Sequence, residues 1–225
     1  MMFRSNSINN NRSLGFNHLS RTTSMPNIKI NVPDARMSLV IKEVNANEAK
    51  RAINIIMNET MLQKDWEYPI YSETFDEPQL NWNDRYNSSC KIFSHIGNCA
   101  KICTESAQGA ENECLFILAY FQGVPVGALQ LKLKYEQGWS EIAFLATHCG
   151  LRSSGYLLIE FSINKTLQLG RSGKLKLVSL PEAKSAYAKM GFDTSGGNGA
   201  YCFLDPAKRS DKWQFNNSCY KYIGF

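Results

Sequence analysis

The stretch THCGLRSSGYLLIEF, Thr147 to Phe161, joins an apolar strand-like run to an apolar helix-like run through small residues and one arginine. Small residues let a backbone approach a ligand closely, and the first N–H groups of a helix have no partner within that helix. Consecutive amides that lead into a helix N-terminus form a cradle for an anion such as phosphate. The stretch therefore predicts a phosphate-binding turn at residues 150–155, with a tight turn that binds nothing as the alternative.

Regular patterns on both sides of this turn predict one α/β domain that begins at residue 38. In chain order they predict a strand, two helices, a meander of three strands, a helix, a strand, a helix and two strands. The expected ranges are 38–44, 46–62, 90–103, 113–121, 125–136, 140–147, 155–170, 174–180, 181–191, 199–205 and 217–225.

The segment AYAKMGF, residues 186–192, resembles the Tyr-x-Lys-x-Gly-Phe ending of the helix after the fifth strand in the GNAT family of N-acetyltransferases. The element order and the turn at 150–155 are similar to the same family over residues 38–225. The resemblance implies an α/β (α+β) fold with a mixed, mostly antiparallel sheet. That sheet is expected to have about seven strands, to be flanked by about four helices and to splay between strands 4 and 5.

The turn departs from the family's Arg/Gln-x-x-Gly-x-Gly/Ala pattern, because Ser153 replaces a glycine and Gly150 takes the first position. A second register starts at Arg152 and places Leu157 at the last glycine, so the apolar helix pattern favours the first register. The resemblance implies acetyl-CoA as acyl donor, with its pyrophosphate on the turn and its pantetheine arm on the strand backbone. Arg152 either pairs with a phosphate or is solvated. The implied cofactor-binding residues are Leu145, Ala146, Thr147, Gly150, Arg152, Ser153, Ser154, Gly155 and Tyr156.

Acetyl transfer from a thioester to an amine needs a base for the amine proton and a hydrogen-bond donor for the departing thiolate. Tyr187 matches the family's tyrosine that faces the sulfur, although a tyrosine at the edge of the core gives the same pattern. Glu141, on the strand before the splay, is the first candidate for the base. His148 at the end of that strand is the second, and a chain of waters is the third.

Two cysteine patterns suggest chemistry, and each is better explained by the core. Cys149 beside His148 does not form a dyad, because neighbouring residues of a strand point to opposite faces. His95, Cys99 and Cys103 have the spacing of helical metal ligands, but they share an apolar stripe. No metal site is predicted.

Residues 65–84 carry six acids, five aromatic residues and no lysine or arginine. In the family this stretch frames the acceptor pocket, and carboxylates and aromatic faces attract cations. The expected acceptor is a polyamine-like molecule, an aminoglycoside or a protein lysine, and a solvated acidic loop is the alternative. The candidate acceptor-binding residues are Glu73, Asp76, Glu77 and Trp82.

Charge is concentrated at the N-terminus of the chain. The 225 residues carry a formal charge of +5, of which residues 1–37 hold +4 (four Arg and one Lys against one Asp). The remainder is nearly neutral, which argues against a broad nucleic-acid surface. Residues 1–37 have the composition of a disordered tail, compatible with a transit peptide, with the export signal of a secreted bacterial effector or with a plain extension.

Seven cysteines without a C-x-x-C motif predict reduced thiols and a cytoplasmic location, and no apolar run is long enough to span a membrane. The sequence thus predicts an acetyl-CoA-dependent N-acetyltransferase with a cationic amine acceptor. A non-catalytic GNAT-like module that binds acyl-CoA or a protein partner is the alternative.

Overall fold

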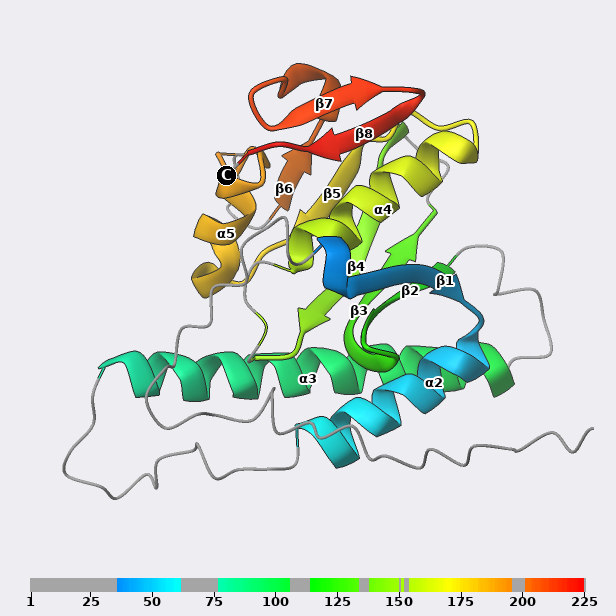
Figure 1. Cartoon of the computed structure of the whole chain (residues 1–225), viewed down its shortest axis with the longest axis vertical. Helices are drawn as coiled ribbons and strands as arrows, with labels where there is room; N and C mark the ends of the chain where they lie inside the picture. The colour runs from blue at the N-terminus through cyan, green and yellow to red at the C-terminus, as the bar shows by residue number, and fades with distance from the viewer. Residues whose placement is uncertain are drawn as a thin grey trace, which may run out of the picture.

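The computed structural model describes residues 36–61, 77–105, 114–133, 138–149, 151, 154–195 and 201–224, with the backbone alone for 77–82 (Figure 1). The strands are β1 (Leu39–Val44), β2 (Cys114–Phe121), β3 (Val124–Lys132), β4 (Ser140–Thr147), β5 (Leu175–Val178), β6 (Tyr201–Leu204), β7 (Trp213–Asn216) and β8 (Cys219–Tyr222). The α-helices are α2 (Ala46–Ile55), α3 (Glu77–Glu105), α4 (Gly155–Gln168) and α5 (Lys184–Lys189). A π-helical turn follows α2 (Ile56–Thr60), and 3-10 turns occur at Pro181–Ala183 and Pro206–Lys208.

Six strands form one sheet in the order β1-β2-β3-β4-β5-β6. Every neighbouring pair is antiparallel except β4 and β5, which are parallel. Such a parallel pair needs a crossover connection, and α4 supplies it. The predicted fold class, a mixed and mostly antiparallel sheet with flanking helices, is confirmed.

The sheet opens between β4 and β5. Their pairing covers only Ser140, Glu141 and Ile142, although β4 continues to Thr147. On its other side β4 is bulged, because Leu131 of β3 faces Ile142 while the preceding Gln130 faces Phe144. A bulge bends its strand and sharpens the local twist. β4 therefore leaves β5 immediately after Ile142, which confirms the predicted splay.

Helices cover the two faces of the sheet separately. Alternating residues of β2 divide between the faces, with Ile117 in the core beneath α4 and its neighbours Phe116 and Leu118 in the core beneath α2 and α3. In β4 the bulge interrupts this alternation, so that Ile142 and Leu145 belong to the first core and Phe144 and Ala146 to the second. Trp213 and Tyr222 extend the first core to the C-terminal hairpin.

The C-terminal hairpin corrects the predicted strand pattern. The residues predicted as a closing strand at 217–225 contain β8, which pairs with β7 in a separate two-stranded sheet instead of joining the main one. β7 is absent from the predicted elements. The two strands are joined by Asn217 and Ser218, both with positive φ (49° and 62°), the turn geometry that suits a two-residue hairpin. The usual Asn-Gly signal is missing from this turn, so the hairpin was not apparent.

Two helices also differ from prediction in length. α3 begins at Glu77 instead of residue 90, because residues 77–89 form helix without an apolar stripe that periodicity can detect. Pro78 in its first turn is a favourable start. The helix predicted over 46–62 changes to π-helix at Ile56, where Met61 N donates to the carbonyl of Ile56.

Candidate functional site

The free end of β4 presents backbone groups to the gap beside β5. His148 N donates to the carbonyl of Val126 on β3 at 2.7 Å. Because backbone direction alternates along an antiparallel strand, the N–H and C=O groups of Leu145 and Thr147 point the other way, toward the gap. Ser89 of α3 donates its hydroxyl to the carbonyl of Thr147 at 3.2 Å. The backbone of Leu145 and the amide of Thr147 therefore face the splay.

α4 begins beside this strand end. Its N-cap residue, Ser154, makes no side-chain capping bond and instead donates its hydroxyl to the carbonyl of Leu151 at 3.3 Å. The first amides of α4, those of Gly155 and Tyr156, are not capped by that hydroxyl. An uncapped helix N-terminus favours an anion through both its N–H groups and its dipole.

Among the described residues, nothing around Gly155 requires a glycine. Its φ is not positive, and a Cβ added there would meet only Leu145 Cδ2 at 3.6 Å, an ordinary contact. Glycine in a helix costs roughly 0.5–1 kcal/mol relative to alanine. Close approach of a ligand is a physical reason to keep the position without a side chain.

Tyr187 lies on α5 and packs against the core beneath α4. Its ring meets that of Phe192 edge-on, with 5.5 Å between centroids. Burial, and to a lesser extent the neighbouring Cys202 thiol, raises the pKa of Tyr187 to about 12. The phenol therefore keeps its proton throughout the physiological range and is available as a donor.

Glu141 lies on the opposite face of β4 from Ile142, which belongs to the core beneath α4. Its Oε2 is 3.9 Å from Nζ of Lys176 on β5, and its side chain is 17% exposed. Lys176 also lies over the ring of Tyr201, 5.7 Å from the centroid. The carboxylate thus stands two residues before the bulged Ala143, on the face that carries α2 and α3.

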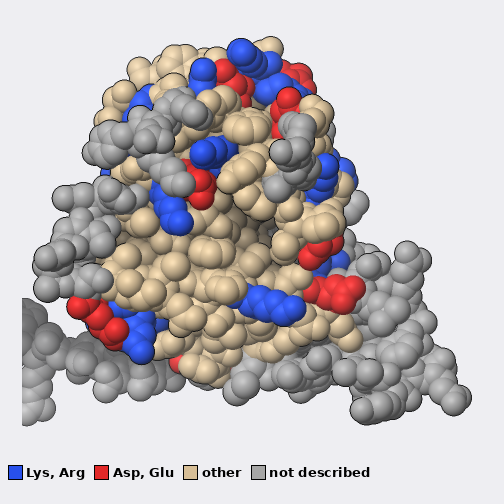
Figure 2. Space-filling view, turned by 180° about the vertical axis from the view of Figure 1, so that it is seen from behind, with Lys and Arg blue, Asp and Glu red and all other residues tan. Residues whose placement is uncertain are grey.

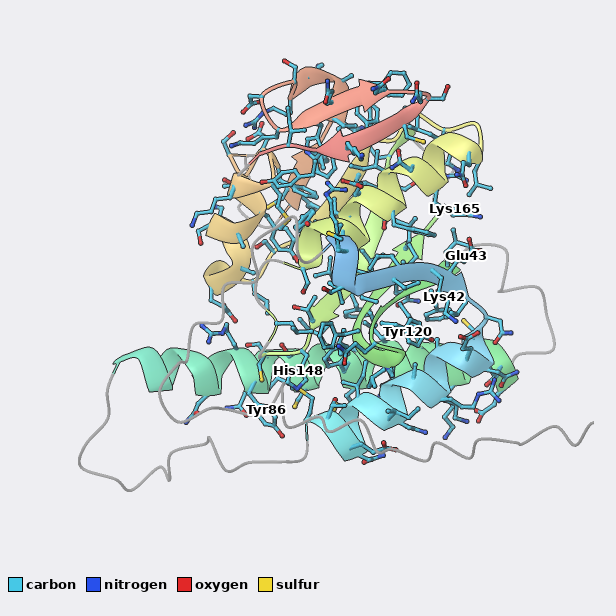
Figure 3. All side chains as sticks on the ribbon, in the orientation of Figure 1. Lys42, Glu43, Tyr86, Tyr120, His148 and Lys165 are labelled. Atoms are coloured by element: carbon cyan, nitrogen blue, oxygen red, sulfur yellow. The ribbon has the colours of Figure 1, made fainter. Side chains whose placement is uncertain are left out.

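His148 is buried at the end of β4, beside α3 (Figure 3). Its Nε2 is 3.2 Å from the carbonyl of Thr60, and only a protonated Nε2 can donate to it. Carbonyls at the end of a helix lack partners within that helix, so His148 supplies a hydrogen-bond donor to the last carbonyl of the π-helical turn. Burial lowers the pKa of His148, and the bond to Thr60 opposes this in part. The geometry supports a structural link, and its role as a base stays a prediction.

The buried imidazole predicts an acid-sensitive fold. Its native pKa lies below the unfolded value of about 6.5, so the unfolded chain takes up more protons below that pH. The contribution of His148 is complete above pH 6.5 and is lost as pH falls toward the lowered native pKa, by up to roughly 1.4 kcal/mol per pH unit. His148→Gln keeps a donor for Thr60 but does not titrate. Urea unfolding at pH 7.5 and 5.5 should show that the free energy of unfolding changes less with pH in the variant than in the wild type. An equal change in both proteins would contradict this assignment.

Several predicted site residues lie outside the described part of the chain. These are Gly150, Arg152 and Ser153 of the turn and Glu73 and Asp76 of the acidic stretch. Glu77 and Trp82 fall in the first two turns of α3, where only the backbone is described. The structure does place Leu145, Ala146, Thr147, Ser154, Gly155 and Tyr156 at the splay and the start of α4.

Two contributors to this region were not predicted from the sequence. Ser89 lies in the part of α3 that lacks apolar periodicity, so no sequence pattern predicts that it lies beside the end of β4. Lys176 lies in the alternating run KLKLV, residues 174–178, whose pattern predicts a half-exposed face but not a partner for Glu141.

The face shown in Figure 2 carries basic side chains interspersed with acidic ones around a broad uncharged area.

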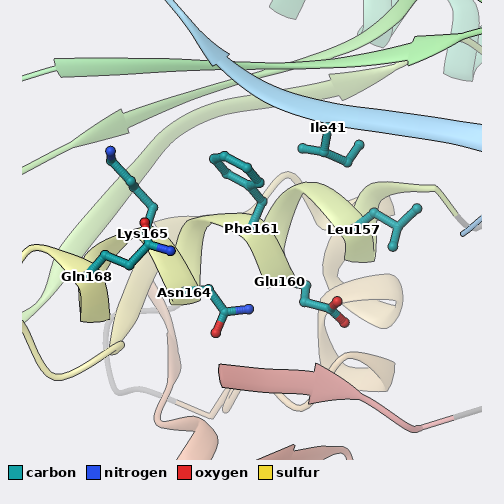
Figure 4. A pocket seen from close by; sticks show the side chains of 7 residues that line it. All are labelled: Ile41, Leu157, Glu160, Phe161, Asn164, Lys165 and Gln168. Carbon is teal, nitrogen blue, oxygen red and sulfur yellow. The ribbon is translucent and has the colours of Figure 1, made fainter. Parts of the chain in front are cut away.

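A cavity of about 210 Å³ lies between α4 and the edge strand β1 (Figure 4). It is lined by Ile41, Leu157, Glu160, Phe161, Asn164, Lys165 and Gln168. Three of its polar members are bonded elsewhere: Glu160 to Arg36, Asn164 to Tyr220 and Lys165 to Glu43.

Among the helices that the structure describes, none is both long and apolar enough to cross a membrane.

No protein-family model matches the chain, and no curated protein matches it significantly. Solved structures do resemble it. They include PaiA N-acetyltransferase from Thermoplasma acidophilum in complex with coenzyme A, at 17% identity over 74% of this chain and 98% of that chain, with a TM-score of 0.45. An N-acetyltransferase from Staphylococcus aureus has 19% identity over 74% and 97%, TM-score 0.42. An acetyltransferase from Thermus thermophilus has 15% identity over 74% and 96%, TM-score 0.43.

Proposed function

We propose that this protein is an acetyl-CoA-dependent N-acetyltransferase that transfers an acetyl group directly to the amine of a cationic acceptor. The observation that carries the proposal is the opening of the sheet after Ile142, next to the start of α4 at Gly155, where the side chain of the N-cap residue Ser154 makes no capping bond. Strand amides that point away from β3 suit a pantetheine arm, and the N-terminus of a helix suits a pyrophosphate. The YAKMGF motif at 187–192 supplies the tyrosine that the chemistry needs.

In the proposed site, the backbone of Leu145 and Thr147 bonds the pantetheine arm, and the amides of Gly155 and Tyr156 bond the pyrophosphate. Acetyl-CoA, when bound, supplies the activated thioester. Tyr187 donates its proton to the sulfur as the carbon–sulfur bond breaks. Glu141 accepts the proton that the attacking amine releases, directly or through water.

Glu141 is preferred to His148 as the base because of where each side chain lies. Glu141 is partly exposed beside the splay, whereas His148 is 4% exposed and its Nε2 is directed to Thr60. A base has to exchange protons with solvent between turnovers, which burial impedes.

Replacement of Glu141 tests this role. Glu141→Gln should lower kcat roughly 10- to 100-fold, at or below the lower end of general-base effects because water can partly replace the base, and because the amide cannot accept the proton. The variant also breaks the contact with Lys176, so Lys176→Met is the matched control and should change kcat less than about threefold. Steady-state rates with saturating acetyl-CoA separate the two. An equal loss in both variants would make the ion pair structural and Glu141 no base.

The acceptor is proposed from the acids and aromatic residues of 65–84, with Glu73, Asp76, Glu77 and Trp82 as its contacts. A polyamine-like molecule or a protein lysine has the required positive charge. We place the enzyme in a reducing cytoplasm, its own or that of a host cell reached through an export signal in residues 1–37.

The proposal is tested by binding and by thiol release on the purified protein. Millimolar acetyl-CoA should raise the melting temperature by mass action, and a panel of amines should release free coenzyme A at rates that identify the acceptor class. A melting temperature unchanged by acetyl-CoA would overturn the proposal. Binding with no thiol release from any amine or lysate protein would instead indicate a non-catalytic module.

A further inference from the structure

Two side chains of α4 make hydrogen bonds to backbone groups of β8. Tyr222 N donates to Glu160 Oε2 at 2.7 Å, and Tyr220 N donates to Asn164 Oδ1 at 2.7 Å. Asn164 Nδ2 also donates to the carbonyl of Tyr220 at 2.9 Å. Four helical residues rise about 6 Å and two strand residues about 6.6 Å, so the spacings match. Figure 4 shows Glu160 and Asn164 pointing from α4 to this strand.

Arg36 lies where Glu160 meets Tyr222. Its Nη1 and Nη2 donate to the two carboxylate oxygens of Glu160 at 2.7 and 2.6 Å, and Nη2 also donates to the carbonyl of Tyr222 at 2.9 Å. The guanidinium lies 5.4 Å from the ring centroid of Tyr156, in the first turn of α4. A bidentate, partly buried pair of this kind holds its partners in one geometry.

The same hairpin also holds the end of α5. Tyr222 donates its hydroxyl to the carbonyl of Lys189 at 3.0 Å, and Trp213 Nε1 donates to the carbonyl of Met190 at 2.8 Å. These carbonyls end the helix that carries Tyr187, and helix ends need such donors. The Tyr222 ring packs on Trp213 and on Tyr156, with centroids 5.1 and 5.2 Å away. Figure 1 shows β8 running from α4 toward α5.

These contacts connect α4 to α5, and such a connection matters because the sheet is open between these two helices. The pairing of β4 with β5 ends at Ile142, so it does not fix the distance between the first turn of α4 and α5. We propose that Arg36, Glu160 and Tyr222 form a splint that sets this distance, and that they are positioning residues for acetyl transfer. The inference rests on the proposed function, since it places Tyr187 relative to the coenzyme.

Hydrogen exchange on the full chain without cofactor tests the splint itself. Tyr222→Phe removes the hydroxyl that bonds Lys189 and keeps the ring, and the loss of one net hydrogen bond corresponds to about fivefold faster local opening. Amides of residues 184–192 should therefore exchange about fivefold faster, and more so in Arg36→Met. Asn164→Ala is the matched control, because it frees β8 at Tyr220 without touching α5. Unchanged exchange at 184–192 in Tyr222→Phe would overturn the splint.

Kinetics test whether the splint serves catalysis. Tyr222→Phe should lower kcat about three- to tenfold while the Kd for acetyl-CoA changes less than twofold, and Asn164→Ala should leave kcat within twofold. If Tyr222 acts through Tyr187, the double variant Tyr187→Phe/Tyr222→Phe should be no slower than Tyr187→Phe alone.

The two readouts separate the two claims. Additive losses in the double variant would overturn the positioning role. A wild-type protein that transfers no acetyl group would overturn the proposed function and the positioning role with it, while the exchange experiment would still decide whether the splint exists.

Discussion

Gly155→Asp is expected to abolish acetyl-CoA binding. The new carboxylate would stand at the first amide of α4, where the proposed site holds a pyrophosphate. Two like charges 4 Å apart repel by about 4 kcal/mol at an effective dielectric constant of 20, which corresponds to roughly 1,000-fold in Kd. Calorimetric titration or a thermal shift with acetyl-CoA would measure the loss, and affinity retained in this variant would place the phosphate elsewhere.

Gly155→Ala separates a defect in folding from a defect in binding. The alanine Cβ has room, 3.6 Å from Leu145 Cδ2, and alanine is the better helix former. The variant should therefore unfold at an equal or higher temperature than the wild type and yet bind acetyl-CoA more weakly. Equal affinity would mean that no ligand approaches the backbone at this position, whatever the aspartate does.

The main sheet and the order of its elements could be predicted because local patterns decide them. β2, β3 and β4 alternate or run apolar, and the turn at Gln122 and Gly123 has positive φ at both residues (48° and 85°), as a two-residue hairpin needs. The motif at 187–192 was informative for a structural reason too. Gly191 ends α5 at φ 94°, and a Cβ there would meet Trp213 Nε1 at 3.4 Å.

The relations that depend on distant residues could not be predicted. Arg36 falls in the stretch that composition assigns to the tail, yet it binds Glu160, which follows 124 positions later. Nothing local to an arginine reveals a partner at that separation. The contact of His148 with the carbonyl of Thr60 likewise joins residues 88 positions apart, so neither its place at the end of a strand nor its usual pKa indicates this partner.

Tyr187→Phe is expected to lower kcat roughly 10- to 100-fold while the Kd for acetyl-CoA changes less than about threefold. The substitution removes the O–H that, in the proposed site, meets the sulfur as it becomes anionic, and it keeps the ring that packs edge-on against Phe192. A thiolate is a fair leaving group, so the loss should lie at the low end of acid–base effects.

The pH dependence of kcat tests whether the phenol is in the protonated form that this role requires. Burial raises the pKa of Tyr187 to about 12, so the phenol remains a donor up to about pH 10 and wild-type kcat should not fall there on its account. If Tyr187 protonates the sulfur, then Tyr187→Phe should lower kcat by the same factor at pH 7 and pH 9, because the donor is present at both in the wild type. Rates measured under saturating acetyl-CoA at the two pH values, with melting temperatures as the control for folding, decide the point. A variant with full turnover at both would make Tyr187 a packing residue and leave the thiolate to water.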